Sequence, residues 1–230
     1  MELKDTKIQK LVSVADVISL LNMSFGFLSI IMTFKGNFLL GALFMIFSLF
    51  FDSIDGWVAR KLQINNELDF GKNIDSLSDA VSFGVAPSVF FYCVGMSTGQ
   101  INEVILLVIS LIMIICGILR LTRYNVIADK IDFKGFIGFP IPGISFILVT
   151  LYLSGLFNIY LASILMIIIA FLMISNVKYP KFNNMAIIGL SAILIILMFL
   201  TINIPLFGIN IPGVILLIIS LGYLLINLIK

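Results

Sequence analysis

Long apolar stretches separated by short polar segments run along almost the whole chain. Each stretch is longer than a globular core requires, and about 20 consecutive apolar residues in a helix cross a bilayer. The pattern therefore predicts an all-α fold, a polytopic membrane helix bundle with about eight transmembrane helices. The expected helices cover residues 17–34, 38–60, 74–96, 102–125, 141–157, 159–175, 184–201 and 210–229. The break between the fifth and sixth helices rests on Ser154, Gly155 and Asn158.

The first 16 residues have a different pattern and predict a short amphipathic helix that lies on the membrane surface. Its apolar face consists of Ile8, Leu11, Val12 and Ala15. Its basic residues are Lys4, Lys7 and Lys10, which suit anionic lipid. A cleaved signal peptide is the alternative, but no small-x-small site follows the apolar run. We also expect Asp16 to cap the first membrane helix.

Composition and charge support a membrane protein and fix an orientation. The chain is 61% hydrophobic and 11% charged, which leaves no soluble domain. Under the eight-helix interpretation, thirteen of the fourteen Lys and Arg residues fall on one side and Lys35 alone falls on the other. Because basic residues favour the cytosolic side, we expect an integral protein of the cell membrane with both termini facing the cytosol. The lysines are too scattered among short loops to predict a nucleic-acid surface.

Four aspartates at helical spacing interrupt this apolar sequence, in the run DSIDGWVARKLQINNELDFGKNIDSLSD. Asp52 and Asp55 are three residues apart, and Asp75 and Asp79 are four apart, so each pair shares one face of a helix. A carboxylate at bilayer depth costs roughly 2.5–3.5 kcal/mol, so four of them indicate a bound ligand, most simply a divalent metal. Orientation by charge places this cluster in a cavity that opens to the cytosol.

The residue types narrow the chemistry further. The chain has no histidine, which excludes imidazole bases, HExxH zinc sites and Ser-His triads. Oxygen-only ligation favours hard cations, so we expect Mg²⁺ or Mn²⁺ first and Ca²⁺ third. Gly56 and Ala59 leave a strip without bulk beside the acids, where a nucleotide could approach, and Arg60 ends it. Helix packing for the small residues and a cytosolic helix edge for Arg60 are the alternatives.

This run resembles the signature of the CDP-alcohol phosphotransferase family, DxxDGxxAR followed by GxxxDxxxD. The resemblance implies a six-helix core, here residues 17–175, with the two helices of residues 176–230 as an addition. It implies two metal ions held by Asp52, Asp55, Asp75 and Asp79. It also implies nucleotide binding by Gly56, Ala59, Arg60 and Gly71, with Asp79 as the catalytic general base, and a homodimer.

Three later stretches look like those of the phosphatidylserine synthase branch of this family. They are DSLSDAVSFGVAP, RLTRYNV and GFPIP, in that order along the chain. The resemblance implies that a CDP-diacylglycerol-type lipid gives its phosphatidyl group to L-serine, and both ester and ether lipids suit these spans. The candidate serine-binding residues are Arg120, Arg123, Tyr124, Asn125, Ser78 and Ser82. The competing interpretations are a basic helix end for RLTRYNV and a proline-bounded loop for GFPIP.

Two other functions remain open at this point. The same family could use a different acceptor, such as glycerol phosphate or an inositol phosphate, but these more anionic acceptors would require additional basic residues. A divalent-cation transporter could use the acids as a pathway, although such residues usually lie near the midplane on broken helices, often within inverted repeats. The sequence shows neither broken helices at the midplane nor inverted repeats. A serine-specific phosphatidyltransferase is therefore the expected function.

Overall fold

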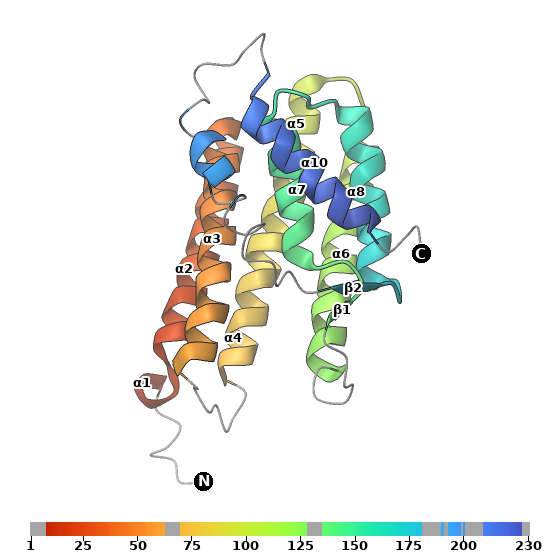
Figure 1. Cartoon of the computed structure of the whole chain (residues 1–230). Helices are drawn as coiled ribbons and strands as arrows, with labels where there is room; N and C mark the ends of the chain where they lie inside the picture. The colour runs from red at the N-terminus through yellow and green to blue at the C-terminus, as the bar shows by residue number, and fades with distance from the viewer. Residues whose placement is uncertain are drawn as a thin grey trace.

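The computed structural model describes residues 8–62, 70–127, 135–180, 190, 193–198, 200 and 209–226. Most of these residues are helical, and the helices pack side by side as a bundle (Figure 1). Among the described residues, a single helical turn, α1 (Ile8–Leu11), precedes the bundle. Residues 1–7 of the expected amphipathic helix lie outside the described ranges, so the surface helix stays a prediction.

The first two long helices, α2 (Val14–Phe34) and α3 (Phe38–Leu62), form an antiparallel pair joined by a tight turn. Helix α2 begins three residues earlier than expected, because Ser13 rather than Asp16 is its N-cap. The backbone N–H of Ser13 donates to the Asp16 carboxylate at 2.7 Å, and the N–H of Asp16 donates to the Ser13 hydroxyl at 3.3 Å. This reciprocal capping box fixes the start of the helix.

The third span is one continuous helix with a local change of winding. It consists of α4 (Phe70–Asp79), a π-helical segment η2 (Ala80–Val85) and α5 (Ala86–Thr98). It starts four residues before the expected boundary at residue 74. The fourth span, α6, covers Glu103–Ile127. These four helical segments are long and apolar enough to cross a membrane, which makes the chain an integral membrane protein.

The remaining described helices are shorter: α7 (Ile141–Leu153), α8 (Ile159–Ile174) and α10 (Ile211–Leu225). At 1.5 Å per residue they are roughly 20–24 Å long, less than the ~30 Å hydrocarbon layer. Helix α7 ends before the expected residue 157, because Gly155 adopts φ 79° and breaks the helix. The total of eight spans is therefore not confirmed. Most of the expected helix at 184–201 lies outside the described residues.

A two-stranded antiparallel sheet, absent from the all-α prediction, joins distant parts of the chain. Strand β1 (Gly135–Ile137) pairs with β2 (Lys178–Pro180), with Phe136 opposite Tyr179. Tyr179 is fully buried and its hydroxyl donates to the Leu224 carbonyl of α10 at 3.2 Å. The Tyr223 hydroxyl of α10 in turn donates to the Pro180 carbonyl at 2.9 Å. Strands of three residues are too short to leave an alternating pattern in the sequence.

The interior and the outer surface of the bundle are both apolar. Buried side chains from α3, α5, α6, α7 and α8 form one core that includes Met45, Phe90 and Ile147. The outer face of α6 exposes a row of large apolar side chains, among them Val104, Leu111 and Ile118. An apolar surface of this extent suits contact with lipid acyl chains rather than water.

Candidate metal and acceptor site

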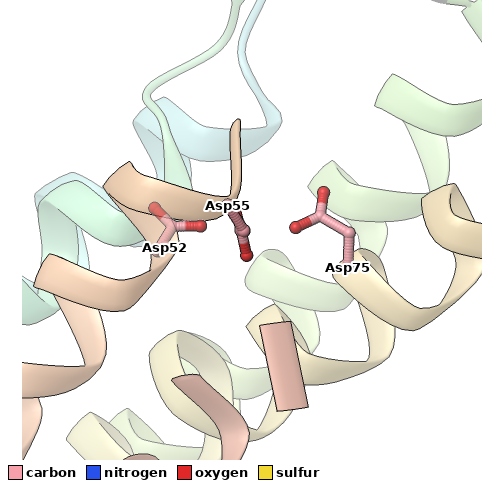
Figure 2. Close-up of side chains that lie close together, drawn as sticks. All are labelled: Asp52, Asp55 and Asp75. Carbon is pink, nitrogen blue, oxygen red and sulfur yellow. The ribbon is translucent and has the colours of Figure 1, made fainter. Parts of the chain in front are cut away.

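Three of the four predicted acids lie together between α3 and α4. Asp52 and Asp55 project from adjacent turns of α3 toward Asp75 of α4 (Figure 2). One carboxylate oxygen of each residue lies within 4.8 Å of the others. Helical spacing puts the first two acids on one face of α3, and antiparallel packing brings the third to the same level.

Asp79 joins this cluster from the last residue of α4. Its carboxyl group lies close enough to those of Asp52 and Asp75 for a direct electrostatic interaction. The side-chain amide of Asn22 donates to Oδ1 of Asp79 at 3.3 Å. Only 8% of Asp79 is exposed, so these neighbours and the interior of the bundle determine its position.

Two residues of α2 that were not predicted as site residues hold the acids in place. The Ser19 hydroxyl donates to Oδ2 of Asp55 at 2.7 Å. Asn22 contacts Asp79, accepts a short hydrogen bond from the Ser48 hydroxyl of α3, and accepts at its backbone carbonyl from Ser82 at 3.1 Å. Asn22 therefore connects α2, α3, α4 and η2.

A signal for these residues is present in the sequence. The buried face of α2 is a stripe of polar and small side chains within an otherwise apolar helix. Its members are Ala15, Asp16, Ser19, Asn22, Gly26, Ser29 and Thr33. A spacing of three or four residues places them on one side, and polar groups on a membrane helix usually face protein partners.

The donor set fits a divalent cation of the hard class. All four side chains offer carboxylate oxygens, the ligand type that Mg²⁺ and Mn²⁺ prefer. Octahedral ligands with bonds of about 2.1 Å are roughly 3.0 Å apart when adjacent and roughly 4.2 Å apart when opposite. The oxygens of Asp52, Asp55 and Asp75, within 4.8 Å of one another, would therefore move closer together around one ion. Several carboxylates in a largely enclosed site also need a compensating positive charge. The cluster is therefore suited to hold divalent metal.

Arg120 supplies a positive charge beside the acids. It lies on α6 and is 5% exposed, within electrostatic range of Asp79 and Asp52. Its guanidinium carbon lies 5.4 Å from the ring centroid of Tyr124 and 5.7 Å from that of Phe136 on β1. In the part of the chain that the structure describes, its guanidinium donates no hydrogen bond to another residue. A buried guanidinium with free donors is a suitable partner for an anionic ligand.

Arg123, the other predicted arginine, has a different environment. Its guanidinium donates to the carbonyls of Ile137, Met173 and Ile174, at distances of 2.8–2.9 Å. These bonds join α6 to β1 and to the end of α8. The structure thus separates the two arginines that the sequence left as equal candidates.

The other predicted acceptor residues come from three elements: Ser78 lies on α4, Ser82 on η2, and Tyr124 and Asn125 on α6. Ser78 lies beside Asp79, is 1% exposed, and its hydroxyl has no hydrogen-bond partner among the described residues. Ser82 is buried and bonded to the Asn22 carbonyl. Asn125 instead donates to Ser76 at 2.7 Å and lines a groove of about 260 Å³ between α4 and α6. Tyr124 is 41% exposed and reaches the site through its contact with Arg120.

The predicted nucleotide-binding residues lie near the acids along the same two helices. Gly56 follows Asp55 on α3, and Gly71 lies one turn before Asp75 on α4. Ala59 and Arg60 belong to the last turns of α3, but their side chains lie outside the described set. Their role in nucleotide binding therefore stays a prediction.

Comparison with known proteins adds independent information on this site. Residues 12–175 match the family model described as CDP-alcohol phosphatidyltransferase. The archaetidylserine synthase of Methanothermobacter thermautotrophicus is 38% identical over 183 residues, covering 80% of this chain and 76% of that protein. The CDP-diacylglycerol–serine O-phosphatidyltransferase of Methanocaldococcus jannaschii is 39% identical over 188 residues, covering 81% and 83%. The Bacillus subtilis protein of the same name is 36% identical over 170 residues, covering 74% and 91%.

Proposed function

The chain belongs to the CDP-alcohol phosphatidyltransferase family, and on that premise we propose that it transfers the phosphatidyl or archaetidyl group of a CDP-activated lipid to the hydroxyl of L-serine, releasing CMP. It is a membrane-embedded transferase. The names of the relatives support serine as the acceptor. The observation that carries the proposal is the meeting of Asp52, Asp55 and Asp75 beside the buried Arg120.

We propose that Asp52, Asp55, Asp75 and Asp79 would hold divalent metal, Mg²⁺ or Mn²⁺, as two ions. Such metal would supply positive charge for the pyrophosphate oxygens and for the CMP leaving group. Ser19 and Asn22 keep the carboxylates of Asp55 and Asp79 in position by donating hydrogen bonds to them. Gly56, Ala59, Arg60 and Gly71 are proposed to receive the nucleotide.

Asp79 is proposed to accept the proton of the serine hydroxyl. As that proton leaves, the serine oxygen forms a bond to the lipid-side phosphorus and the bond from this phosphorus to the CMP oxygen breaks. Asp79 suits this role because its carboxyl group interacts electrostatically with Asp52 and Asp75 and lies within electrostatic range of Arg120. One side chain could then serve both the metal-binding acids and an acceptor held by Arg120.

Arg120 is proposed to hold the serine carboxylate. Its planar guanidinium can donate two parallel hydrogen bonds to a carboxylate, and burial strengthens this pairing. The Ser78 hydroxyl, next to Asp79 in sequence, has no hydrogen-bond partner among the described residues and is available as a further polar contact for the acceptor. Arg123 is occupied by three backbone carbonyls and is therefore not assigned to the acceptor.

A reconstituted transfer assay tests the proposal. Purified protein is mixed with CDP-diacylglycerol or CDP-archaeol, Mn²⁺ and radiolabelled serine, and both the labelled lipid and CMP are measured. We expect one CMP per labelled lipid, no turnover after exhaustive chelation, and recovery with Mn²⁺ or Mg²⁺. Efficient transfer to glycerol phosphate or an inositol phosphate, with none to serine, would refute the acceptor assignment.

A binding measurement separates the roles of the acids. Asp79→Asn should lose serine transfer yet still bind the CDP-lipid, because Asp52, Asp55 and Asp75 remain. Loss of lipid binding in this variant would assign Asp79 to metal holding alone. The cell-membrane location, the cytosolic orientation of the site and a homodimeric state are further proposals, supported by the charge distribution and the resemblance described above.

A further inference from the structure

The two arginines of the RLTRYNV stretch, Arg120 and Arg123, have different roles. We propose that Arg123 is a positioning residue: it fixes strand β1 so that the Phe136 ring lies over the Arg120 guanidinium, and thereby sets the affinity for the acceptor. This inference rests on the proposed function, in which Arg120 binds the serine carboxylate. It assigns to Arg123 no contact with either substrate.

The contacts of Arg123 are those of a clamp between three elements. One terminal nitrogen donates to the Ile174 carbonyl at 2.9 Å, and the other donates to Met173 at 2.8 Å and Ile137 at 2.9 Å. The carbonyls at the end of α8 have no partner within their own helix, so an arginine is a favourable partner there. The third bond reaches β1, which is thereby tied to both α6 and α8.

The tie to β1 acts on Arg120 through one neighbouring residue. Phe136 directly precedes Ile137, whose carbonyl Arg123 binds, and the Phe136 ring lies over the Arg120 guanidinium at 5.7 Å. Tyr124 offers a second ring at 5.4 Å. Two aromatic faces hold the guanidinium by cation–π contact while leaving its edge N–H groups available. A shift of β1 would move one of these faces and turn the guanidinium.

The backbone around Gly138 supports this arrangement from the other side of Ile137. Gly138 adopts φ 79°, and its N–H donates to the Val177 carbonyl at 2.7 Å. A Cβ at this position would collide with the Met173 carbonyl and with the Arg123 guanidinium. The glycine therefore lets Arg123 approach the end of α8 and β1 together.

Steady-state kinetics on matched variants tests the inference. Arg123→Lys keeps the positive charge but loses the planar set of guanidinium N–H donors. Phe136→Leu keeps an apolar side chain but loses the aromatic ring. Both variants should raise the KM for serine roughly 3- to 30-fold, the range expected for a lost cation–π contact, with a nearly unchanged KM for the CDP-lipid. Phe136→Tyr should restore the wild-type value, because it keeps the ring face.

Thr122→Val is the control on the same helix, since the exposed Thr122 hydroxyl donates to the Ile118 carbonyl of its own helix and to no other described residue. The double variant Arg123→Lys with Phe136→Leu should be no worse than the poorer single variant, because both changes act on one arrangement. An unchanged serine KM in Arg123→Lys, with only a lower melting temperature, would reduce Arg123 to a structural role. A larger KM increase than in Arg120→Lys would make it a direct ligand.

The rate of chemical modification of Arg120 tests the same inference without measuring serine transfer. Phenylglyoxal modifies arginine, and the chain has three arginines, Arg60, Arg120 and Arg123, which mass spectrometry of peptides can distinguish. Arg120 should react several-fold faster in Arg123→Lys and in Phe136→Leu than in the wild type, with Arg60 as internal reference. Unchanged Arg120 reactivity would overturn the inference, whereas absence of serine transfer by the wild type would overturn the proposed function alone.

Discussion

Replacing Asn22 by alanine removes the side chain that connects α2 to the acids. Asn22 is fully buried, donates to Oδ1 of Asp79 and accepts from the Ser48 hydroxyl. A hydrogen bond to a charged group contributes roughly 1.5–3 kcal/mol. If this energy holds Asp79 in its productive position, its loss should reduce kcat about 10- to 150-fold, at a factor of ten per ~1.4 kcal/mol.

The same change should affect stability separately. The Ser48 hydroxyl is fully buried and would lose its acceptor, at a cost of about 1–3 kcal/mol.

Asn22→Asp should have a lower turnover than Asn22→Ala, because it places a further carboxylate against Asp79 in place of a hydrogen-bond donor. Both variants would be compared in the serine-transfer assay at saturating substrate and in thermal unfolding of the detergent-solubilised protein.

Ser24→Ala is the matched control on α2. Its hydroxyl is exposed and bonds to the Leu20 carbonyl of its own helix, so both kcat and unfolding should stay close to wild type. If Asn22→Asp retains wild-type kcat within a factor of two, the contact between Asn22 and Asp79 has no role in the reaction. The assignment of α2 as the support of the acidic cluster would then be wrong.

Three further predictions concern the metal site, β1 and the orientation. Asp52→Asn and Asp75→Asn should each reduce turnover at least ~100-fold, about 2.7 kcal/mol of barrier, in protein that still purifies folded; near-normal rates would exclude the proposed metal site. Gly138→Ala should displace Arg123 and raise the KM for serine, measured beside wild type, and an unchanged value would contradict the close approach at this position. Lys61 and Lys35 are both exposed, and each can be replaced by cysteine. An impermeant maleimide should label the cysteine at position 61 from the cytosolic side and the cysteine at position 35 from the external side. The reverse labelling pattern would show the opposite topology.

The acidic cluster could be predicted because its information is local. Asp52 and Asp55 share a helix face by spacing alone, and the membrane environment makes carboxylates there expensive without a ligand. The structure brings both together with Asp75, as expected from their common face and the pairing of two consecutive helices. Ser19 and Asn22 also lie on a visible polar stripe, but which acid each one contacts depends on how α2 packs against α3 and α4.

The division between Arg120 and Arg123 could not be predicted, because it depends on contacts between segments far apart in sequence. The two residues are of one type and three positions apart, yet β1 and the end of α8 occupy only Arg123. Strand β1 itself exists through pairing with β2, and three residues carry too little pattern to reveal it. The early end of α7 likewise depends on the left-handed backbone of Gly155, which hydropathy does not report.

The π-helical segment at Ala80–Val85 has a consequence for the tolerance of the chain to changes of length. A π turn accommodates one residue more than an α turn, and each residue of an α-helix rotates the chain by about 100°. The segment thus offsets the face that carries Asp75 and Asp79 from the face by which α5 packs in the core. Deleting one residue here would convert the π-helical segment into a regular α-helix. The deletion would either rotate Asp75 and Asp79 away from α3 or disrupt the packing of α5 in the core. The length of this stretch is therefore a structural constraint, because it sets the rotation between the acidic site and the packed core.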